Sequence, residues 1–154
     1  MKLKINKFLF TLIALLFGFS GSVAAQYGVV ENHYTIKGQV LSEKCQTPIP
    51  DIKVMLNIVD TYGNRRIDTT QTDADGNFAV TLITTNMGSI ARCDLRAQDV
   101  DGKANKGDFV GYSQSLVLNN QDYTLVRKES WDNYYDSKQT YYIGMKFKDD
   151  TPCK

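Results

Sequence analysis

The chain has 154 residues, of which 42% are hydrophobic and 23% charged, and its formal net charge at pH 7 is +1. A chain of this length folds as one domain that buries roughly two-thirds of its unfolded surface, so it needs no metal ion or disulfide merely to fold. The near-neutral charge provides no basic patch of the kind that binds nucleic acid.

The N-terminus has the three-part pattern of a secretory signal peptide. Residues 1–7 carry three lysines and no acid, residues 8–19 are almost wholly apolar, and residues 20–25 are mostly small. The apolar run is too short for a membrane-spanning helix, which needs roughly 20 residues. We therefore predict that residues 1–25 are removed before Gln26, which leaves an exported, slightly acidic mature chain with no membrane span. An uncleaved membrane anchor is the alternative.

After an extended leader over residues 26–33, apolar side chains recur at every second position. Such alternation indicates half-buried β-strands, because successive side chains of a strand point to opposite faces. Further strands are expected near residues 66–71 and 110–118. The alternating sets are, in chain order, Ile36 and Val40; Ile52, Val54, Leu56 and Ile58; Phe78, Val80 and Leu82; Cys93, Leu95 and Ala97; and Tyr141, Ile143, Met145 and Phe147.

Turn residues separate these segments, as in Asp73-Ala74-Asp75-Gly76-Asn77. The pattern contains no convincing amphipathic helix. It therefore predicts an all-β fold, an antiparallel β-sandwich of about seven short strands over residues 34–150. Residues 119–137 lack the alternation and are interpreted as a long loop or an irregular edge. Residues 151–154 form a C-terminal tail.

Three segments within residues 34–83 carry a family resemblance. They are a strand with a central glycine, Ile36-Lys37-Gly38-Gln39-Val40, a proline-bounded entry to the next strand, Thr47-Pro48-Ile49-Pro50-Asp51-Ile52-Lys53-Val54, and a turn, Thr72-Asp73-Ala74-Asp75-Gly76-Asn77-Phe78. Together they resemble the carboxypeptidase regulatory-like domain. The resemblance implies a transthyretin-like (prealbumin-like) sandwich.

Two more motifs extend the resemblance: Tyr27-Gly28 and Asp99-Val100-Asp101-Gly102-Lys103-Ala104-Asn105-Lys106-Gly107-Asp108-Phe109. They are similar to the radical SAM-associated lipoprotein family of Bacteroidetes-type bacteria. That resemblance implies an envelope protein without catalytic residues, related to a neighbouring radical SAM enzyme as its substrate or neighbour. A lipoprotein needs cysteine as its first mature residue, and the first cysteine here is Cys45. The sequence therefore favours a periplasmic or secreted form without a lipid anchor.

The three cysteines allow one disulfide and one leftover thiol in an oxidising compartment. Cys93 falls on the apolar face of its strand, which predicts a buried thiol. Cys45 follows the first strand and Cys153 follows the last, and the first and last strands of such sandwiches can be near each other. We predict a Cys45–Cys153 disulfide, with three free thiols as the alternative. The spacing lacks the short cysteine pairs typical of zinc sites.

An acid-rich segment provides the candidate metal ligands Asp99, Asp101, Asn105 and Asp108. Carboxylates on alternate loop residues can supply the several oxygens that Ca²⁺ requires, although the segment does not complete an EF-hand. The alternative is a turn whose side chains cap backbone amides. No other cofactor is predicted.

A Ser-His-Asp or Cys-His catalytic pair would have to use His33, the only histidine, which falls in the leader and is poorly placed for a rigid site. A glycosidase-like carboxylate pair stays open, because separation is invisible in sequence. We predict that the protein is not an enzyme.

Trp131, Tyr134 and Tyr135 form a possible aromatic surface for a glycan or peptide, with packing onto the sheet as the alternative. The sequence thus predicts an exported, non-enzymatic accessory protein of the bacterial cell envelope, whose partner would be a radical SAM enzyme or another envelope protein. The second hypothesis is a free-standing glycan-, protein- or calcium-binding module.

Overall fold

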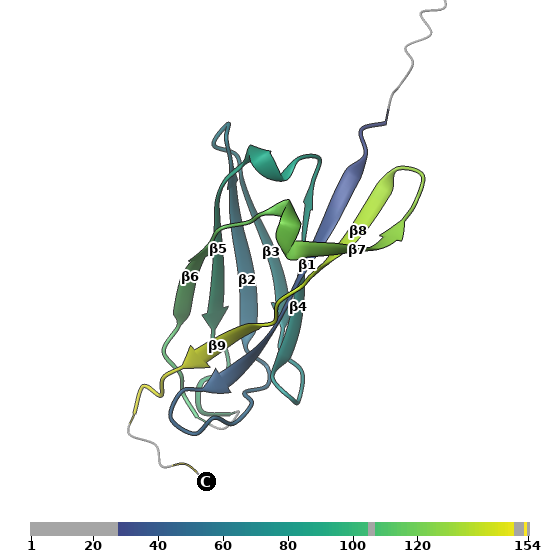
Figure 1. The fold of residues 1–154 in the computed structure, drawn as a ribbon. Coiled ribbons are helices and arrows are strands. Elements are labelled where there is room, and N and C mark those ends of the chain that lie inside the picture. The colour runs from purple at the N-terminus through teal and green to yellow at the C-terminus, as the bar shows by residue number, and fades with distance from the viewer. Residues whose placement is uncertain (1–27, 105–106, 150–152, 154) are drawn as a thin grey trace, which may run out of the picture.

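The computed structural model describes residues 28–104, 107–149 and 153 (Figure 1). The predicted signal peptide and its cleavage site lie outside these residues. Within them, no helix is long and apolar enough to cross a membrane. The strands are β1 (Glu31–Ser42), β2 (Lys53–Asp60), β3 (Arg65–Gln71), β4 (Asn77–Thr84), β5 (Ile90–Gln98), β6 (Tyr112–Leu116), β7 (Tyr123–Lys128), β8 (Asp132–Ser137) and β9 (Tyr141–Met145), with short 3-10 helices η1 (Met87–Ser89), η2 (Gly102–Ala104) and η3 (Asn120–Asp122).

The strands form two sheets that pack face to face. The first sheet has the order β4-β1-β8-β7, with β9 also paired to β1, and the second has the order β3-β2-β5-β6. Antiparallel pairing dominates, but β1 runs parallel to both β8 and β9. The predicted all-β sandwich is confirmed. The described residues contain nine strands where the sequence predicted about seven.

The core lies between the two sheets. It contains inward-facing residues that the alternation predicted, together with others that it did not, such as Phe109 and Ile49. Ile36, Val54 and Leu95 are fully buried, and they come from both sheets. Burying apolar surface stabilises the fold by about 25 cal/mol for each Å², so this interior is the main source of stability. Its largest fully buried side chains are Phe109, Ile36, Ile49, Ile52, Leu56, Leu82, Leu95, Ile143, Met145, Val40, Val54 and Cys93.

The strands β8 and β9 together form one interrupted strand beside β1. Glu31 to Thr35 pair with β8, and Gly38 to Ser42 pair with β9. At the interruption, the backbone N–H of Lys37 donates to Ser137 Oγ at 3.2 Å. The long first strand thus has the last two strands of the chain as its neighbours on one side, and β4 as its neighbour on the other.

Two local predictions need revision. Residues 119–137 form η3 and the β7–β8 hairpin, which Figure 1 shows beside β1. Strand β7 is the edge of the first sheet, and its register with β8 shifts between Leu125 and Arg127, so the irregular edge is confirmed and the long loop is not. Strand β1 begins at Glu31, so the last three residues of the predicted leader, His33 among them, belong to a strand. The hairpin escapes detection because five of the six residues of β7 are exposed, so its sequence carries no apolar alternation.

The predicted disulfide is confirmed. Cys45 and Cys153 are joined with an S–S distance of 2.02 Å and a Cα–Cα distance of 5.4 Å. The bond connects the turn after β1 to the C-terminal segment beyond β9. Cys93 is a free thiol and only 2% exposed, as predicted. Burial, and next the neighbouring Asp94 carboxylate, raise the pKa of Cys93 to about 12.

Candidate functional site

The predicted aromatic surface is divided between the two faces of β8. Successive residues of a strand point to opposite faces, so Tyr134 and Tyr135 cannot share one. Tyr135 stacks on the buried Tyr34, with ring centroids 4.7 Å apart and an interplanar angle of 13°. Tyr34 in turn meets Tyr123 edge to face at 5.0 Å. Tyr135 therefore packs against the core and does not belong to an exposed platform.

Tyr134 lies on the outer face, between neighbours from the two flanking strands. His33 of β1 stacks on its ring, with centroids 4.5 Å apart and an interplanar angle of 20°. Arg127 of β7 places its guanidinium carbon 3.7 Å from the centroid of the same ring. Aromatic stacking and cation–π contacts of this kind each contribute about 0.5–1 kcal/mol at partly exposed positions. The three side chains form a layer that fixes the orientation of the histidine ring.

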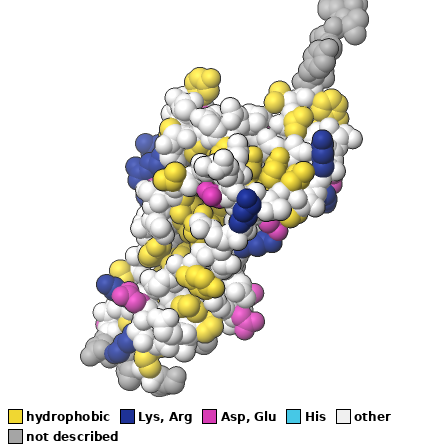
Figure 2. Space-filling model, viewed as in Figure 1, with side chains coloured by type: hydrophobic (Ala, Val, Ile, Leu, Met, Phe, Trp, Pro, Cys, Tyr) yellow, Lys and Arg dark blue, Asp and Glu magenta, His cyan; other side chains and the backbone are white. Residues whose placement is uncertain are grey.

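Trp131 precedes β8 and is 57% exposed. Its carbonyl oxygen accepts a hydrogen bond from the Glu31 backbone N–H at 2.9 Å, which ties the tip of the hairpin to the start of β1. Val29 and Val30, on the segment that enters β1, are also exposed. The tryptophan thus belongs to a solvent-facing apolar area at this end of the sheet, separate from Tyr135. Figure 2 shows hydrophobic side chains on this part of the surface.

Donor atoms that could hold a metal ion meet beside the aromatic layer. Glu31, His33 and Asp132 each offer one ligand atom, and these atoms lie within 4.8 Å of one another. His33 Nε2 is 3.5 Å from Asp132 Oδ1. The sequence did not point to this group, because His33 was placed in the leader and Asp132 in an irregular loop. Only the parallel pairing of the first strand with β8 brings them together.

The carboxylate of Asp99 caps backbone amides in the predicted calcium loop. Its Oδ1 accepts from the N–H groups of Asp101 at 3.2 Å and Gly102 at 2.9 Å, and its Oδ2 accepts from Phe109 N–H at 2.9 Å. Partial burial raises the pKa of Asp99, but the hydrogen bonds from Phe109, Asp101 and Gly102 outweigh it and hold that pKa below its usual value. Asp99 is thus occupied by its own loop.

The remaining predicted calcium ligands do not complete a site within the described residues. Asp108 Oδ1 lies 2.5 Å from Lys148 Nζ, and this contact raises the pKa of the lysine. Asn105 falls outside the described residues. The contacts favour the alternative interpretation, in which the acid-rich segment is a turn held by its own carboxylates.

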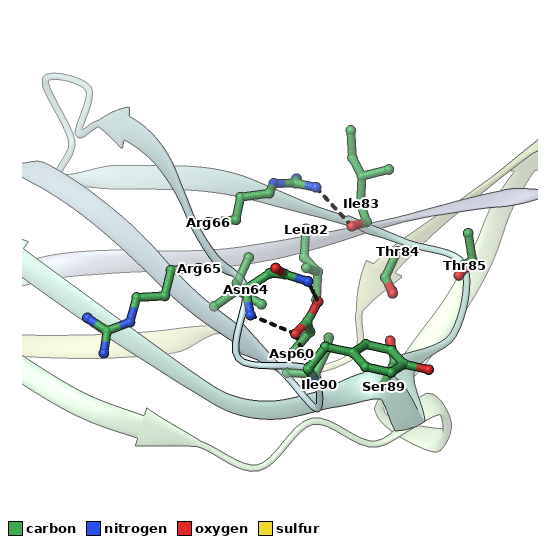
Figure 3. Close-up of a pocket in the computed structure, with 12 residues that line it drawn as sticks. Asp60, Asn64, Arg65, Arg66, Leu82, Ile83, Thr84, Thr85, Ser89 and Ile90 are labelled. Carbon is green, nitrogen blue, oxygen red and sulfur yellow. Dashed lines mark hydrogen bonds between the residues drawn. The ribbon is translucent and has the colours of Figure 1, made fainter.

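A cleft of about 600 Å³ opens between the edges of the two sheets, at the end of the sandwich that carries the β2–β3 turn (Figure 3). The buried side chains of Ile58 and Leu82 contribute apolar surface to it, whereas Tyr62 is 87% exposed. Its complete lining is Ile58, Asp60, Tyr62, Asn64, Arg65, Arg66, Leu82, Ile83, Thr84, Thr85, Ser89 and Ile90.

Hydrogen bonds hold the walls of this cleft in place. Arg66 of β3 donates from Nη1 to the carbonyl oxygen of Ile83 in β4 at 3.0 Å, which links the two sheets at their edges (Figure 3). The Asp60 carboxylate accepts from the backbone N–H groups of Tyr62 and Asn64 at 2.8 and 2.9 Å. The β2–β3 turn is therefore held in place by the Asp60 carboxylate. The sequence did not reveal the cleft, because its lining comes from four strands and two turns.

No family model matches the chain, and no curated protein matches it. Among solved structures, the fold is similar to a 3-chlorocatechol 1,2-dioxygenase from Rhodococcus opacus 1CP, with a TM-score of 0.50, 10% sequence identity and 77% of this chain covered. The chain spans 60% of the length of that enzyme. It is also similar to the major plantain pollen allergen Pla l 1, with a TM-score of 0.40, 14% identity, and coverage of 78% of this chain and 98% of the allergen. At these identities, the likeness describes the β-sandwich fold alone.

Proposed function

We propose that this chain is an exported, non-enzymatic accessory protein of the bacterial cell envelope that acts as a binding module. The Cys45–Cys153 disulfide is the main observation that supports export. Disulfides persist in secreted and periplasmic proteins and are reduced in the cytosol, so a bond that staples the sandwich calls for an oxidising compartment. The signal-peptide pattern of residues 1–25 supports the same destination.

The environments of Cys93 and His33 favour a binding role over catalysis by a cysteine–histidine pair. Cys93 lies in the core, and its raised pKa keeps it protonated and unreactive near neutral pH. His33, the only histidine of the chain, has its ring against Tyr134 and its Nε2 near Asp132. Neither group contacts the cleft between the sheets.

The cleft between the edges of the two sheets is the candidate ligand-binding site. Small-molecule sites usually enclose about 300–1,000 Å³, with apolar walls and a few placed polar groups. Here Ile58 and Leu82 offer apolar surface, Tyr62 stands at the solvent side, and the hydroxyl groups of Thr84 and Ser89 and the carboxylate of Asp60 are the polar groups of the lining. This combination suits a small amphipathic molecule with hydrogen-bonding groups.

Intact mass measurement of the exported protein tests the location. The full-length gene is expressed in a bacterium, and the periplasmic and secreted fractions are analysed. We expect a chain that begins at Gln26, carries no lipid, and weighs two hydrogen masses less than after reduction. The Cys153→Ser variant should lack that reduction-dependent mass change. Recovery of the uncleaved chain in the cytoplasm, or a reduced Cys45, would contradict the proposal.

Dye binding tests the cleft separately. The amphipathic anion 8-anilinonaphthalene-1-sulfonate serves as the probe, and its fluorescence is measured with the folded protein. Thr85→Trp adds a large side chain at the rim of the cleft and should reduce the signal, whereas Thr124→Trp, at an exposed position of β7, should leave it unchanged. Equal signals from both variants would place dye binding elsewhere.

A link to a radical SAM enzyme is a second candidate, favoured by the Tyr27-Gly28 and Asp99–Phe109 motifs. A neighbouring radical SAM gene would support it. Co-expression with that enzyme, followed by mass spectrometry, asks whether the chain is a substrate. An unchanged mass would count against the substrate role.

A further inference from the structure

Glu31, His33 and Asp132 share the outer face of the first sheet. Glu31 and His33 are two positions apart in β1, so their side chains point to the same side. The register of β1 with β8 places Glu31 opposite Asp132 and His33 opposite Tyr134. The two carboxylates are therefore direct cross-strand partners, and the imidazole of His33 lies two residues farther along β1 on the same face.

Two features of this arrangement are unfavourable: the repulsion between the two carboxylates and the missing hydrogen-bond partner of the His33 ring. Two carboxylates held close together on neighbouring strands repel each other. His33 Nε2 is itself buried and has no hydrogen-bond partner among the described residues. A buried nitrogen without a hydrogen-bond partner is destabilising. A cation between the three groups would satisfy all of them at once.

The histidine ring is held in the orientation that such a cation needs. Its stack on Tyr134, which Arg127 contacts in turn, restricts rotation of the ring. The 3.5 Å between Nε2 and Asp132 Oδ1 is long for a hydrogen bond. It matches the separation of about 3.4 Å between two ligands of one tetrahedral zinc ion with metal–ligand distances of about 2.0–2.1 Å.

We infer that Glu31, His33 and Asp132 bind one divalent transition-metal ion of the zinc type. An imidazole nitrogen with two carboxylate oxygens is a donor set for zinc-like ions, whereas Ca²⁺ takes six to eight oxygens. The Glu31 side chain is exposed and can adjust to the ion, while His33 is set by its stack. Three protein ligands leave a fourth position for water or for a donor atom of a bound molecule. The inference goes beyond the proposed function and does not depend on export or on the cleft.

The competing explanation is a protonated His33 that pairs with the two carboxylates without any metal. The two cases differ in their response to zinc. Because the chain has a single histidine, the imidazole ¹⁵N resonances in an NMR spectrum come from His33 alone. The untagged mature chain, stripped with a chelator, is titrated with zinc chloride. Calorimetry measures the binding, and NMR follows the imidazole ¹⁵N resonances. We expect one equivalent bound and a shift of the Nε2 resonance that is complete at that equivalent.

Variants assign the binding to these residues. Asp132→Asn should weaken zinc binding by at least about tenfold, and Glu31→Gln should weaken it as well. Asp136→Asn is the matched control, since it makes the same change on the same face of β8, where Asp136 pairs with Lys37; its affinity should equal that of the wild type. His33→Ala should abolish zinc binding, and if that variant does not fold, the two carboxylate variants decide. The inference is overturned if no heat is released and the ring resonances stay in place, or if Asp132→Asn binds zinc as tightly as the wild type.

Discussion

Gly38 of β1 faces Phe78 of β4 across the first sheet so closely that no side chain fits between them. A Cβ atom at position 38 would lie 2.3 Å from Phe78 Cζ and 2.3 Å from the carbonyl oxygen of Tyr141 in β9. The second contact is with backbone, so it cannot be relieved by rotating a side chain. The glycine thus permits the close approach of three strands at the point where the interrupted strand resumes.

We predict that Gly38→Ala lowers the free energy of unfolding by about 2–3 kcal/mol, because overpacked positions of this kind force side chains and backbone to shift. Urea unfolding followed by circular dichroism measures the change. Gly144→Ala is the control, because the nearest atom to its added Cβ would be Glu43 Cβ at 3.6 Å. Equal stability of Gly38→Ala and the wild type would refute the close approach.

Removal of the disulfide by Cys45→Ser should destabilise the protein by up to about 4–5 kcal/mol. The bond joins residues separated by 108 positions, and closing so long a loop restricts the unfolded chain strongly in the chain-entropy model. Unfolding curves with and without reductant provide the measurement. Reductant should destabilise the wild type and leave Cys45→Ser unaffected. A wild type insensitive to reductant would be inconsistent with a stabilising bond.

Acid should weaken the contribution of Asp94, a buried carboxylate of β5. The Ser115 hydroxyl donates to Asp94 Oδ1 at 2.6 Å, and Arg92 Nε lies 2.8 Å from Oδ2. These contacts, that of Ser115 first, hold the pKa of Asp94 below its ordinary value of 3.8. Because the folded pKa is the lower one, the stabilisation is present above the unfolded pKa. It is lost as the pH falls through the folded pKa.

Melting temperatures of the wild type and Asp94→Asn between neutral and strongly acidic pH would reveal this effect. We expect the wild type to have the higher melting temperature near neutral pH. The difference in melting temperature between the two proteins should shrink as the pH falls below the ordinary pKa of an aspartate. Asp75→Asn, at an exposed turn position, serves as the control and should track the wild type. A difference that is constant across the pH range would argue against a lowered pKa at Asp94.

Cys93 should resist alkylation in the folded protein. The thiol is 2% exposed, and the pKa of about 12 leaves almost no thiolate near neutral pH. Treatment with iodoacetamide should modify no cysteine in the native state and one in urea, as counted by mass spectrometry. Modification of the native protein would indicate either an accessible Cys93 or an open disulfide.

The sequence predicted the strands whose two faces differ. Val54 and Leu56 alternate with the less buried Lys53, Met55 and Asn57 because one face of β2 is turned to the core, and that contrast is visible in a single chain. The β7–β8 hairpin carries no such contrast. Its pairing depends on backbone hydrogen bonds and on Tyr123 and Tyr135, which reach inward from an otherwise polar stretch.

The disulfide could be predicted because each cysteine lies beside a recognisable strand. The Glu31–His33–Asp132 group could not, because it requires knowing that the first strand runs parallel to β8. A parallel pairing leaves no turn between the partners and hence no local signal. The sequence also did not predict that Tyr134 and Tyr135 lie on opposite faces of the sheet, because residues 132–137 carry no alternation that indicates a strand.

Strand β1 is the first strand of the chain, and it has β4 on one side and the last two strands, β8 and β9, on the other, which constrains the order of assembly. A polypeptide threaded through a membrane with its N-terminus leading presents β1 first and β8 and β9 last. Until those final segments emerge, one side of β1 has no partner. The proposed export would therefore leave the first sheet incomplete until β8 and β9 have crossed the membrane, and the chain would remain unfolded during its passage.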